Sequence, residues 1–365
     1  MISDAELPEL SDFRKAEARS HFEISTLYED LVVAATNDRS PVHRWFRFKE
    51  SFSADLLRVV LDDLKPRRKK IRLLDPFCGV GTSLIASQEL RAADYTITAT
   101  GIERNPFIAF VARTKVNWPR MDKRLLRELP LAILAQKPSA SPSLPRNSSF
   151  LTSRCITSHV TRRLLEVAQA IREHGTTPSH EALLLGLASA IEPLSRTRKD
   201  GRALRIVMKP RTRISSVLAA KWNSIVEDVG LMQRSLGSVP VPDVLFGDGR
   251  RPASLGIPAH SQDLVFTSPP YPNNIDYTEV YKLELWLLGY VKSANEFLQL
   301  RRQTFRSHPT SGLEDPCKEF IAASRRGRLG SLLSPIVARI ANLEEPWRRR
   351  VILGYFSDLW TTLEG

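Results

Sequence analysis

The sequence has 365 residues, of which 42% are hydrophobic, so it can bury the core of one large domain or two ordinary ones. Lys and Arg number 53 against 40 Asp and Glu, a formal net charge of +13 that favours a polyanionic partner, most simply nucleic acid. A basic protein without such a partner is the alternative. No apolar run is long enough to span a bilayer, the start lacks a signal-peptide core, and the three cysteines show no metal-ligand spacing. We therefore expect a cytoplasmic, nucleoid-associated protein without a metal site.

The first elements in chain order are helices and then two strand–helix units. Residues 1–40 have a loose helical pattern, and residues 41–64 are an aromatic and basic approach to an amphipathic helix. Residues 69–90 read as a strand, a glycine-containing turn and a helix, and residues 95–116 repeat this order. Two successive units of this kind predict an α/β fold with a parallel, doubly wound sheet.

The strand–helix rhythm then stops for more than a hundred residues. A Pro- and Ser-rich segment at 135–150 has the composition of a linker, and residues 151–236 are mostly helical in pattern with one basic stretch. Strand patterns return at 243–250 and 262–271. The sequence thus predicts a mainly helical insertion at 118–240, between the second and third strands of one sheet.

The turn in the first unit reads DPFCGVGT, from Asp75 to Thr82. Gly79 and Gly81 allow the backbone to approach a ligand closely, and the helix that follows offers free N–H groups to a carboxylate or phosphate. Asp75, at the end of the strand, can hold a cationic amine. The turn is not a phosphate-binding Walker loop, because Thr82 stands where the required lysine would be.

Two more carboxylates end the next two predicted strands. Glu103 occupies the position of the usual clamp on two ribose hydroxyls, although it can also serve only as a charge near a helix N-terminus. Asp248 can accept a hydrogen bond from an adenine amino group, or simply hold a turn. One glycine turn, one ribose clamp and one adenine contact at successive strand tips predict a nucleoside-containing cofactor lying across the sheet.

The fourth predicted strand ends in Ser268-Pro269-Pro270-Tyr271. The two prolines fix two φ angles, remove two backbone donors and push each preceding residue out of the helical region. The result is a stiff corner that presents free carbonyl groups and ends in an aromatic ring. Such a corner favours a rigid acceptor site beside a flat surface; a buried structural corner is the alternative.

The glycine turn and this corner together resemble a known pair of motifs. DPFCGVGT and TSPPY are similar to the paired signature of the S-adenosylmethionine-dependent amino methyltransferases of DNA, which methylate cytosine at N4 or adenine at N6. Serine at the first position resembles the cytosine-N4 branch, whereas Asp or Asn is more usual for adenine. The resemblance covers roughly residues 40–116 and 240–290, and it departs from the family at Val80, where Ser is common. It implies a Rossmann-like methyltransferase fold, S-adenosylmethionine as cofactor and double-stranded DNA as partner.

The resemblance also implies roles for the four corner residues. A base amine is a poor nucleophile, and the enzyme must swing the base out of the helix to reach it. The hydroxyl of Ser268 and the carbonyl of Pro269 are the expected acceptors for the two amine hydrogens, in a corner that Pro270 stiffens. Tyr271 is expected to stack on the flipped base, a contact worth roughly 1–3 kcal/mol. No covalent intermediate and no metal are required.

The cofactor site is expected to include an upstream segment, 43–53, which in this family closes over the methionine end of the cofactor. Trp45 or Phe48 is expected to pack on the cofactor and Ser51 to hydrogen-bond its carboxylate, with an aromatic core patch as the alternative. The complete set of predicted cofactor-binding residues is Asp75, Phe77, Gly79, Gly81, Thr82, Glu103, Asn105, Asp248, Trp45 and Ser51.

The long insertion resembles the family's target-recognition region, which in one arrangement lies between the two motifs. On this interpretation residues 1–117 hold the N-terminal helices and the cofactor-binding half, 118–240 the target-recognition region, and 241–365 the catalytic half. Arginine and lysine density in the insertion suits phosphate contacts, although a solvated basic loop has the same composition. The predicted nucleic-acid-binding residues are Arg196, Arg198, Lys199, Arg202, Arg205, Asn273 and Asn274; the two asparagines can instead order their loop.

The end of the chain resembles the helix that precedes the family's fifth strand, with no closing hairpin after it. We therefore expect the C-terminal strands to be missing and one side of the sheet to be left open, for a second chain to complete. The leading function is cytosine-N4 methylation of DNA. The alternatives are adenine-N6 methylation of DNA, guanine-N2 methylation of RNA, and a methyltransferase-like fragment that binds nucleic acid without turnover.

Overall fold

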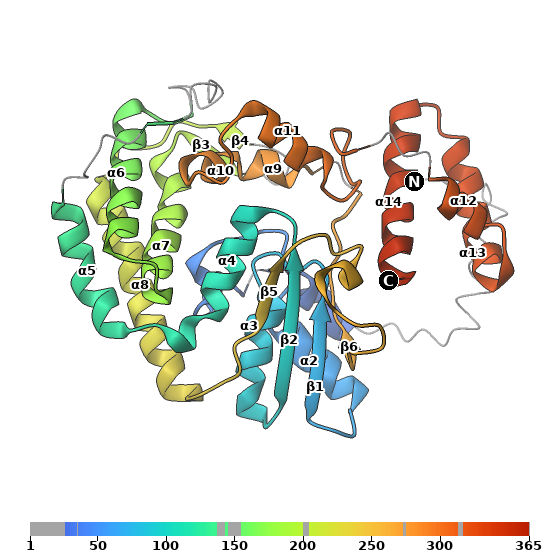
Figure 1. The fold of residues 1–365 in the computed structure, drawn as a ribbon, viewed down its shortest axis with the longest axis horizontal. Coiled ribbons are helices and arrows are strands. Elements are labelled where there is room, and N and C mark those ends of the chain that lie inside the picture. Colours follow the sequence, from blue (N-terminus) through green and yellow to red (C-terminus); the bar gives the residue numbers. More distant parts are fainter. Residues whose placement is uncertain are drawn as a thin grey trace.

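The computed structural model in Figure 1 is built around one parallel sheet. It describes residues 26–34, 36–136, 143–144, 155–199, 204–272, 275–312 and 317–364. The sheet has four strands in the order β5-β2-β1-β6, and every pair is parallel. The strands are β1 (Lys70–Asp75), β2 (Thr96–Glu103), β5 (Asp243–Phe246) and β6 (Leu264–Val265). The predicted α/β class with a mostly parallel sheet is confirmed.

Helices and one small hairpin make up the other elements. The helices before and within the sheet region are η2 (Thr26–Val32), η3 (His43–Trp45), α2 (Asp55–Leu64), α3 (Thr82–Glu89), η4 (Leu90–Ala93), α4 (Pro106–Val116) and η5 (Trp118–Arg120). The insertion holds α5 (Lys123–Ala135), α6 (Ser158–His174), α7 (Pro178–Leu194), the antiparallel strands β3 (Thr197–Lys199) and β4 (Leu204–Ile206), and α8 (Ile214–Leu236). The rest are η6 (Pro252–Leu255), α9 (Tyr277–Val280), α10 (Lys282–Leu287), α11 (Ala294–Arg302), α12 (Lys318–Ala323), α13 (Gly327–Ala341) and α14 (Pro346–Glu364).

Buried and exposed residues alternate along the start of β1 because successive side chains of a strand point to opposite faces of the sheet. In β1, Ile71 and Leu73 are buried, whereas Arg72 between them is exposed. Gly101 in β2 allows the turn and the helix that follow β1 to lie close to β2, since a Cβ atom there would be 2.7 Å from both Cys78 Cβ and Leu84 Cδ1. The glycine turn and α3 are therefore pressed directly against the second strand.

The insertion packs on the sheet domain as a group of helices, drawn in green and yellow in Figure 1. Its centre is the contact between α7 and α8, where the indole of Trp222 donates to the carbonyl of Leu183 at 2.8 Å. Gly186 makes room for that ring, because a Cβ atom there would be 2.5 Å from Trp222 Cδ1. The buried apolar cluster is continuous from β1 and α3 into these helices. The boundaries of the three predicted regions stay a prediction.

The segment before α2 is held to the insertion by one buried carboxylate. Asp228 of α8 accepts hydrogen bonds from the main-chain N–H of Val42, from the guanidinium of Arg44 and from the indole of Trp45, at 2.7–3.0 Å. From the other side, Lys115 of α4 donates to two carbonyl groups of this segment, and burial lowers the pKa of its ammonium to about 7. These contacts fix where the next residues, 46–52, enter the sheet region.

The C-terminal helices lie on the far side of the sheet from the insertion (Figure 1). Asp358 of α14 accepts from Arg306 and from Arg250, which follows β5, so an ion-pair network ties this helix to the strand ends. The expected helical end of the chain is confirmed in α14. Among the described strands, β6 pairs with β1 alone, and Val265 is 59% exposed. The missing strands and the second chain stay predictions.

The described residues contain neither a bilayer-spanning helix nor a cluster of metal-ligating side chains. None of the helices seen there combines the length and apolar character needed to cross a bilayer. Nor does that part of the chain bring three or more His, Cys, Asp or Glu side chains together in a way that could hold a metal ion.

Candidate active site

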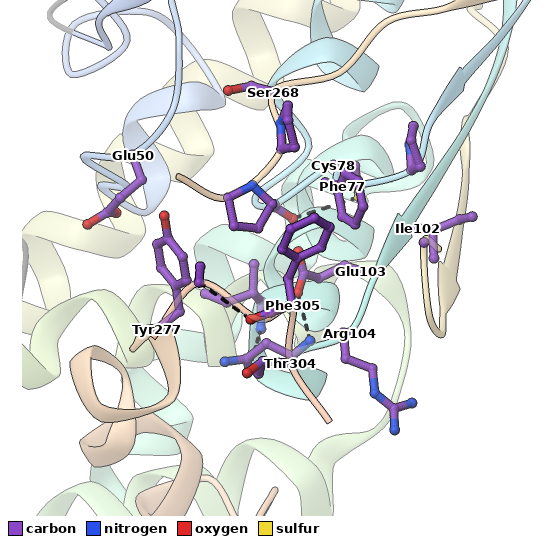
Figure 2. A pocket seen from close by; sticks show the side chains of 18 of the residues that line it. Glu50, Phe77, Cys78, Ile102, Glu103, Arg104, Ser268, Tyr277, Thr304 and Phe305 are labelled. Atoms are coloured by element: carbon purple, nitrogen blue, oxygen red, sulfur yellow. Dashed lines mark hydrogen bonds between the residues drawn. The ribbon is translucent and has the colours of Figure 1, made fainter. Parts of the chain in front are cut away.

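A cavity with an empty volume of about 1080 Å³ opens at the carboxyl ends of the strands (Figure 2). This is the edge of a parallel α/β sheet at which ligands generally bind. The lining comes from the segment before α2, the ends of β1, β2, β5 and β6, the start of α9 and the segment after α11. Most of the predicted cofactor-binding residues and all four corner residues line it, namely Ser51, Phe77, Gly79, Thr82, Glu103, Asn105, Asp248, Ser268, Pro269, Pro270 and Tyr271.

Asp75 ends β1, directly before the turn residues that line the cavity. Its carboxylate is buried and accepts from the main-chain N–H of Phe77 at 3.1 Å and from the hydroxyl of Ser83. Desolvation raises the pKa of Asp75 to about 6, although hydrogen bonds from Ser83, Phe77 and Thr267 oppose the rise. The contact with Thr267 joins the glycine turn to the strand that carries the Ser-Pro-Pro-Tyr corner.

The two glycines of the turn adopt left-handed backbone conformations, with φ of 53° at Gly79 and 83° at Gly81. A Cβ atom on Gly79 would be 3.4 Å from the ring of Phe48, which lies across the turn. Gly81 precedes α3, and the first residue of that helix, Thr82, has its hydroxyl 2.5 Å from the hydroxyl of Ser51. The turn therefore presents main-chain groups to the cavity and is roofed by the predicted upstream segment.

Glu103 and Asn105 lie together at the end of β2. The main-chain N–H of Asn105 donates to Glu103 at 2.7 Å. Desolvation raises the pKa of Glu103 to about 7, against the effect of N–H groups from Asn105, Arg104 and Gly79. The side-chain oxygen of Asn105 caps α4 by accepting from the next two N–H groups of the helix. Its side-chain nitrogen is buried and has no hydrogen-bond partner among the residues that the structure describes, so this residue of the cavity wall holds an unused donor.

Asp248, at the end of β5, is engaged by Arg250. The guanidinium donates to both carboxylate oxygens at 2.7–3.1 Å, and the main-chain N–H of Arg250 adds a bond of 3.0 Å. Burial alone would raise the pKa of Asp248, but the hydrogen bonds and charge of Arg250 outweigh it and lower the pKa. This arrangement matches the turn-holding alternative, while the carboxylate still borders the cavity. An adenine contact at Asp248 stays a proposal.

The prediction that Trp45 packs on the cofactor needs correction. Trp45 does not border the cavity; it is buried in the core, where its indole donates to Asp228 at 2.9 Å. The ring that borders the cavity is Phe48, stacked on Tyr281 with centroids 5.6 Å apart. The core-patch alternative thus holds for Trp45, whereas Phe48 and Ser51 line the cavity.

The Ser-Pro-Pro-Tyr corner forms one side of the cavity, and the ring of Tyr271 is half exposed at its mouth. Asp276 begins the next helix by accepting from two of its N–H groups and is held from outside by Arg301 at 2.8 Å. Tyr281, just after this helix, is buried in the core. The corner is therefore anchored on its far side by a rigid helix end.

Several lining residues escaped the sequence analysis. Glu50 stands between Ser268 and Tyr277 at one side of the cavity in Figure 2, and burial raises the pKa of its carboxyl. The segment after α11 contributes Phe305, whose ring meets Phe77 edge-on with centroids 5.3 Å apart. Neither a single glutamate inside an aromatic and basic segment nor a loop without a repeated pattern predicts a binding residue from the local sequence. Only the folded chain brings them to the strand ends.

The predicted nucleic-acid-binding residues divide into three groups. Arg196, Arg198 and Arg205 are exposed on or beside the β3–β4 hairpin. Lys199 is buried, with its ammonium 2.5 Å from Glu284 and 4.3 Å from the centre of the Tyr281 ring. Since successive strand residues face opposite sides, Lys199 points inward when Arg198 points outward, and we withdraw it from the DNA-contact set. The remaining predictions, Arg202, Asn273 and Asn274, lie outside the described residues.

Comparison with known proteins identifies relatives that share most of this chain. It is 28% identical to the Type II methyltransferase M.AvaI of Nostoc sp. (strain PCC 7120) over 327 residues, which is 82% of this chain and 65% of the relative. The same figures hold for M.AvaI of Anabaena variabilis. The Type II methyltransferase M.BsoBI of Geobacillus stearothermophilus is 26% identical over 302 residues, 73% of this chain and 56% of the relative. The chain thus spans less than two thirds of these relatives' length. No protein-family model and no solved structure matches it.

Proposed function

We propose that this chain is a site-specific DNA methyltransferase that methylates the exocyclic amine of a base flipped out of the duplex, with cytosine N4 as its acceptor. The observation that carries the proposal is the cavity itself. The glycine turn and the Ser-Pro-Pro-Tyr corner come from distant parts of the sequence, and they line one cavity at the carboxyl ends of the strands. The homology to Type II methyltransferases supports the same reaction class.

S-adenosylmethionine is the methyl donor of Type II DNA methyltransferases, and the cavity suits it. Glu103 would accept from the ribose hydroxyls, Asp75 would stabilise the cationic amine through the turn, and Ser51 would donate to the carboxylate. The side-chain nitrogen of Asn105, which has no hydrogen-bond partner among the described residues, is a donor available to such a ligand. When bound, the cofactor supplies an electrophilic methyl group on a positively charged sulfur.

The protein's contribution to the reaction is to position the amine. The hydroxyl of Ser268 and the carbonyl of Pro269 accept from the two amine hydrogens and so favour a pyramidal nitrogen whose lone pair is available. Tyr271, half exposed at the mouth, stacks on the flipped base. The new nitrogen–carbon bond replaces the sulfur–carbon bond, and the amine releases one proton to water. A neutral hydroxyl at position 268, in place of a carboxylate, supports cytosine over adenine.

The test is methyl transfer from labelled S-adenosylmethionine to mixed-sequence double-stranded DNA, followed by identification of the modified nucleosides by mass. We expect N4-methylcytosine, and we expect Ser268→Ala to abolish most of it. Ser254→Ala is the matched control, because Ser254 is an exposed serine bonded only to a carbonyl in its own turn. N6-methyladenine would overturn the base assignment, and label in RNA would overturn the DNA assignment. Cofactor binding without transfer to any of these would favour a non-catalytic fragment.

A further inference from the structure

A second cavity, with an empty volume of about 1320 Å³, lies beside the active-site cavity. Residues 44–50, α7, the β3–β4 hairpin with the residues after it, and α8 line it. The two cavities meet at Glu50, which borders both. Tyr281 borders the second cavity and stacks on Phe48 of the first, so a single aromatic wall separates them.

The lining of this second cavity, the basic cavity, is dominated by positive charge. Its cationic residues are Arg44, Arg47, Lys49, Arg198, Lys199, Lys209 and Lys221, against Glu50, Glu192 and Glu284. Some of the cations are neutralised inside the protein: Arg44 pairs with Asp228, Arg47 with Asp38 and Lys199 with Glu284. Within the part of the chain that the structure describes, the ammonium groups of Lys49 and Lys209 instead donate to main-chain carbonyl groups, and their nearest carboxylates, Glu50 and Glu192, act only through charge.

The electrostatics of two lysines agree with this imbalance. Burial lowers the pKa of Lys209, and the positive charges of Arg198 and Lys199 lower it further, although Glu192 opposes them. Burial likewise lowers the pKa of Lys221, although the negative charges of Glu192 and Asp38 oppose this effect. Cations held in a partly dehydrated space with too few carboxylates are stabilised when an anion enters.

Apolar side chains stand at the edge of the same space. Met208 is 95% exposed and borders the basic cavity, and Ile206, two residues earlier on the hairpin, is 58% exposed. Single exposed apolar side chains are common on protein surfaces, but next to cations these two suit a ligand that has both charged and apolar surfaces. A DNA strand is such a ligand, since phosphates alternate with sugars and base edges, and proteins press Met and Ile side chains against them.

We propose that the basic cavity binds the sugar–phosphate backbone of the DNA strand whose base enters the active-site cavity. The inference rests on the proposed function. A nucleotide that crosses the wall at Glu50 and Tyr281 would place its base beside the Ser-Pro-Pro-Tyr corner and its flanking phosphates among Lys49, Lys209 and Lys221. The hairpin then supplies only part of the contact, and residues 44–50 and α8 supply the rest.

The test measures DNA affinity against salt for the purified chain, by fluorescence anisotropy of a labelled mixed-sequence duplex. The variant is Lys49→Gln with Lys221→Gln. Each lost phosphate contact reduces the slope of log K against log salt by about 0.9, so we expect the slope to fall by up to about 1.8. The control is Arg67→Gln with Lys70→Gln, which removes the same charge at the opposite end of β1. We expect its slope to match the unmodified chain.

The outcomes separate this inference from the proposed function. An unchanged slope in the variant, an equal fall in the control, or no binding of DNA by the unmodified chain would overturn the inference even if methyl transfer is observed. A fall confined to the variant supports it even if no methyl group is transferred. A slope change seen with duplex RNA but not with DNA would overturn the choice of DNA. Thermal unfolding checks that the variant is folded; if it is not, Lys49→Gln alone replaces it, with an expected fall in slope of up to about 0.9.

Discussion

Removal of one buried carboxylate should loosen the wall of the active site from a distance. Asp228 accepts from Val42 N at 3.0 Å, from Trp45 Nε1 at 2.9 Å, and from Arg44 Nε and Nη2 at 3.0 and 2.7 Å. In Asp228→Ala these donors lose their acceptor. Val42 and Trp45 are buried, so water does not replace it. The segment they belong to leads directly to Phe48.

The expected loss of stability follows from the donors that remain. A buried donor left without a partner costs about 1–3 kcal/mol, so the two buried N–H groups together cost about 2–6 kcal/mol. Arg44 adds at most about 1 kcal/mol, because its side chain is about one third exposed and can turn toward water. We therefore expect the free energy of unfolding to fall by about 3–5 kcal/mol, in the range for breaking a buried charge pair.

Urea unfolding and calorimetric titration with S-adenosylmethionine measure the two consequences, stability and cofactor affinity. We expect both to fall, because residues 46–52 lose their anchor. Glu227→Ala is the control: Glu227 is the neighbouring carboxylate, 72% exposed and 3.7 Å from Arg44, and its loss should cost less than about 0.5 kcal/mol. A loss below about 1 kcal/mol in Asp228→Ala, or an equal loss in the control, would refute the reasoning.

Three further predictions concern the cavity itself. Ser268→Ala should lower kcat by about 10²-fold with little change in cofactor affinity, measured by single-turnover transfer and titration, because one acceptor for the amine is removed. Gly249→Ala should lower kcat/KM by about 10²-fold, since its Cβ would lie 1.9 Å from the Pro76 carbonyl oxygen and must displace the turn; unchanged kinetics would contradict the close approach. The pKa of Glu103 is raised from 4.5 to about 7, so folding favours its protonated form, and this contribution is complete below pH 4.5 and lost as the pH rises through about 7. Urea unfolding of the cofactor-free protein at pH 5 and pH 8 should show a drop that is smaller in Glu103→Gln by at most about 3 kcal/mol, an upper limit because Glu103 keeps some solvent contact. Equal drops in both proteins would show that Glu103 is not the group.

The features readable from the sequence were those that depend on near neighbours in the chain. A strand, two glycines with room for positive φ and a helix start follow one another between Lys70 and Glu89, and each has a local cause. The strand of the second unit ends in Glu103, as the sequence predicts. These local patterns also predict that the first two strands run parallel, because the helix between them returns the chain to the end of the sheet where β1 begins.

Tertiary structure decided which side chains of the non-repetitive segments face the cavity. Trp45 and Phe48 are three residues apart in one aromatic stretch, and only the carboxylate of Asp228 on a distant helix draws Trp45 into the core. Lys199 sits in the most basic stretch of the chain, yet strand alternation and Glu284 bury it. The local sequence shows which residues are charged or aromatic, but it does not show which distant residue each side chain contacts. Burial and pairing are long-range, so the sequence determined the motifs, and packing alone determined Phe48, Glu50 and Phe305 as their neighbours.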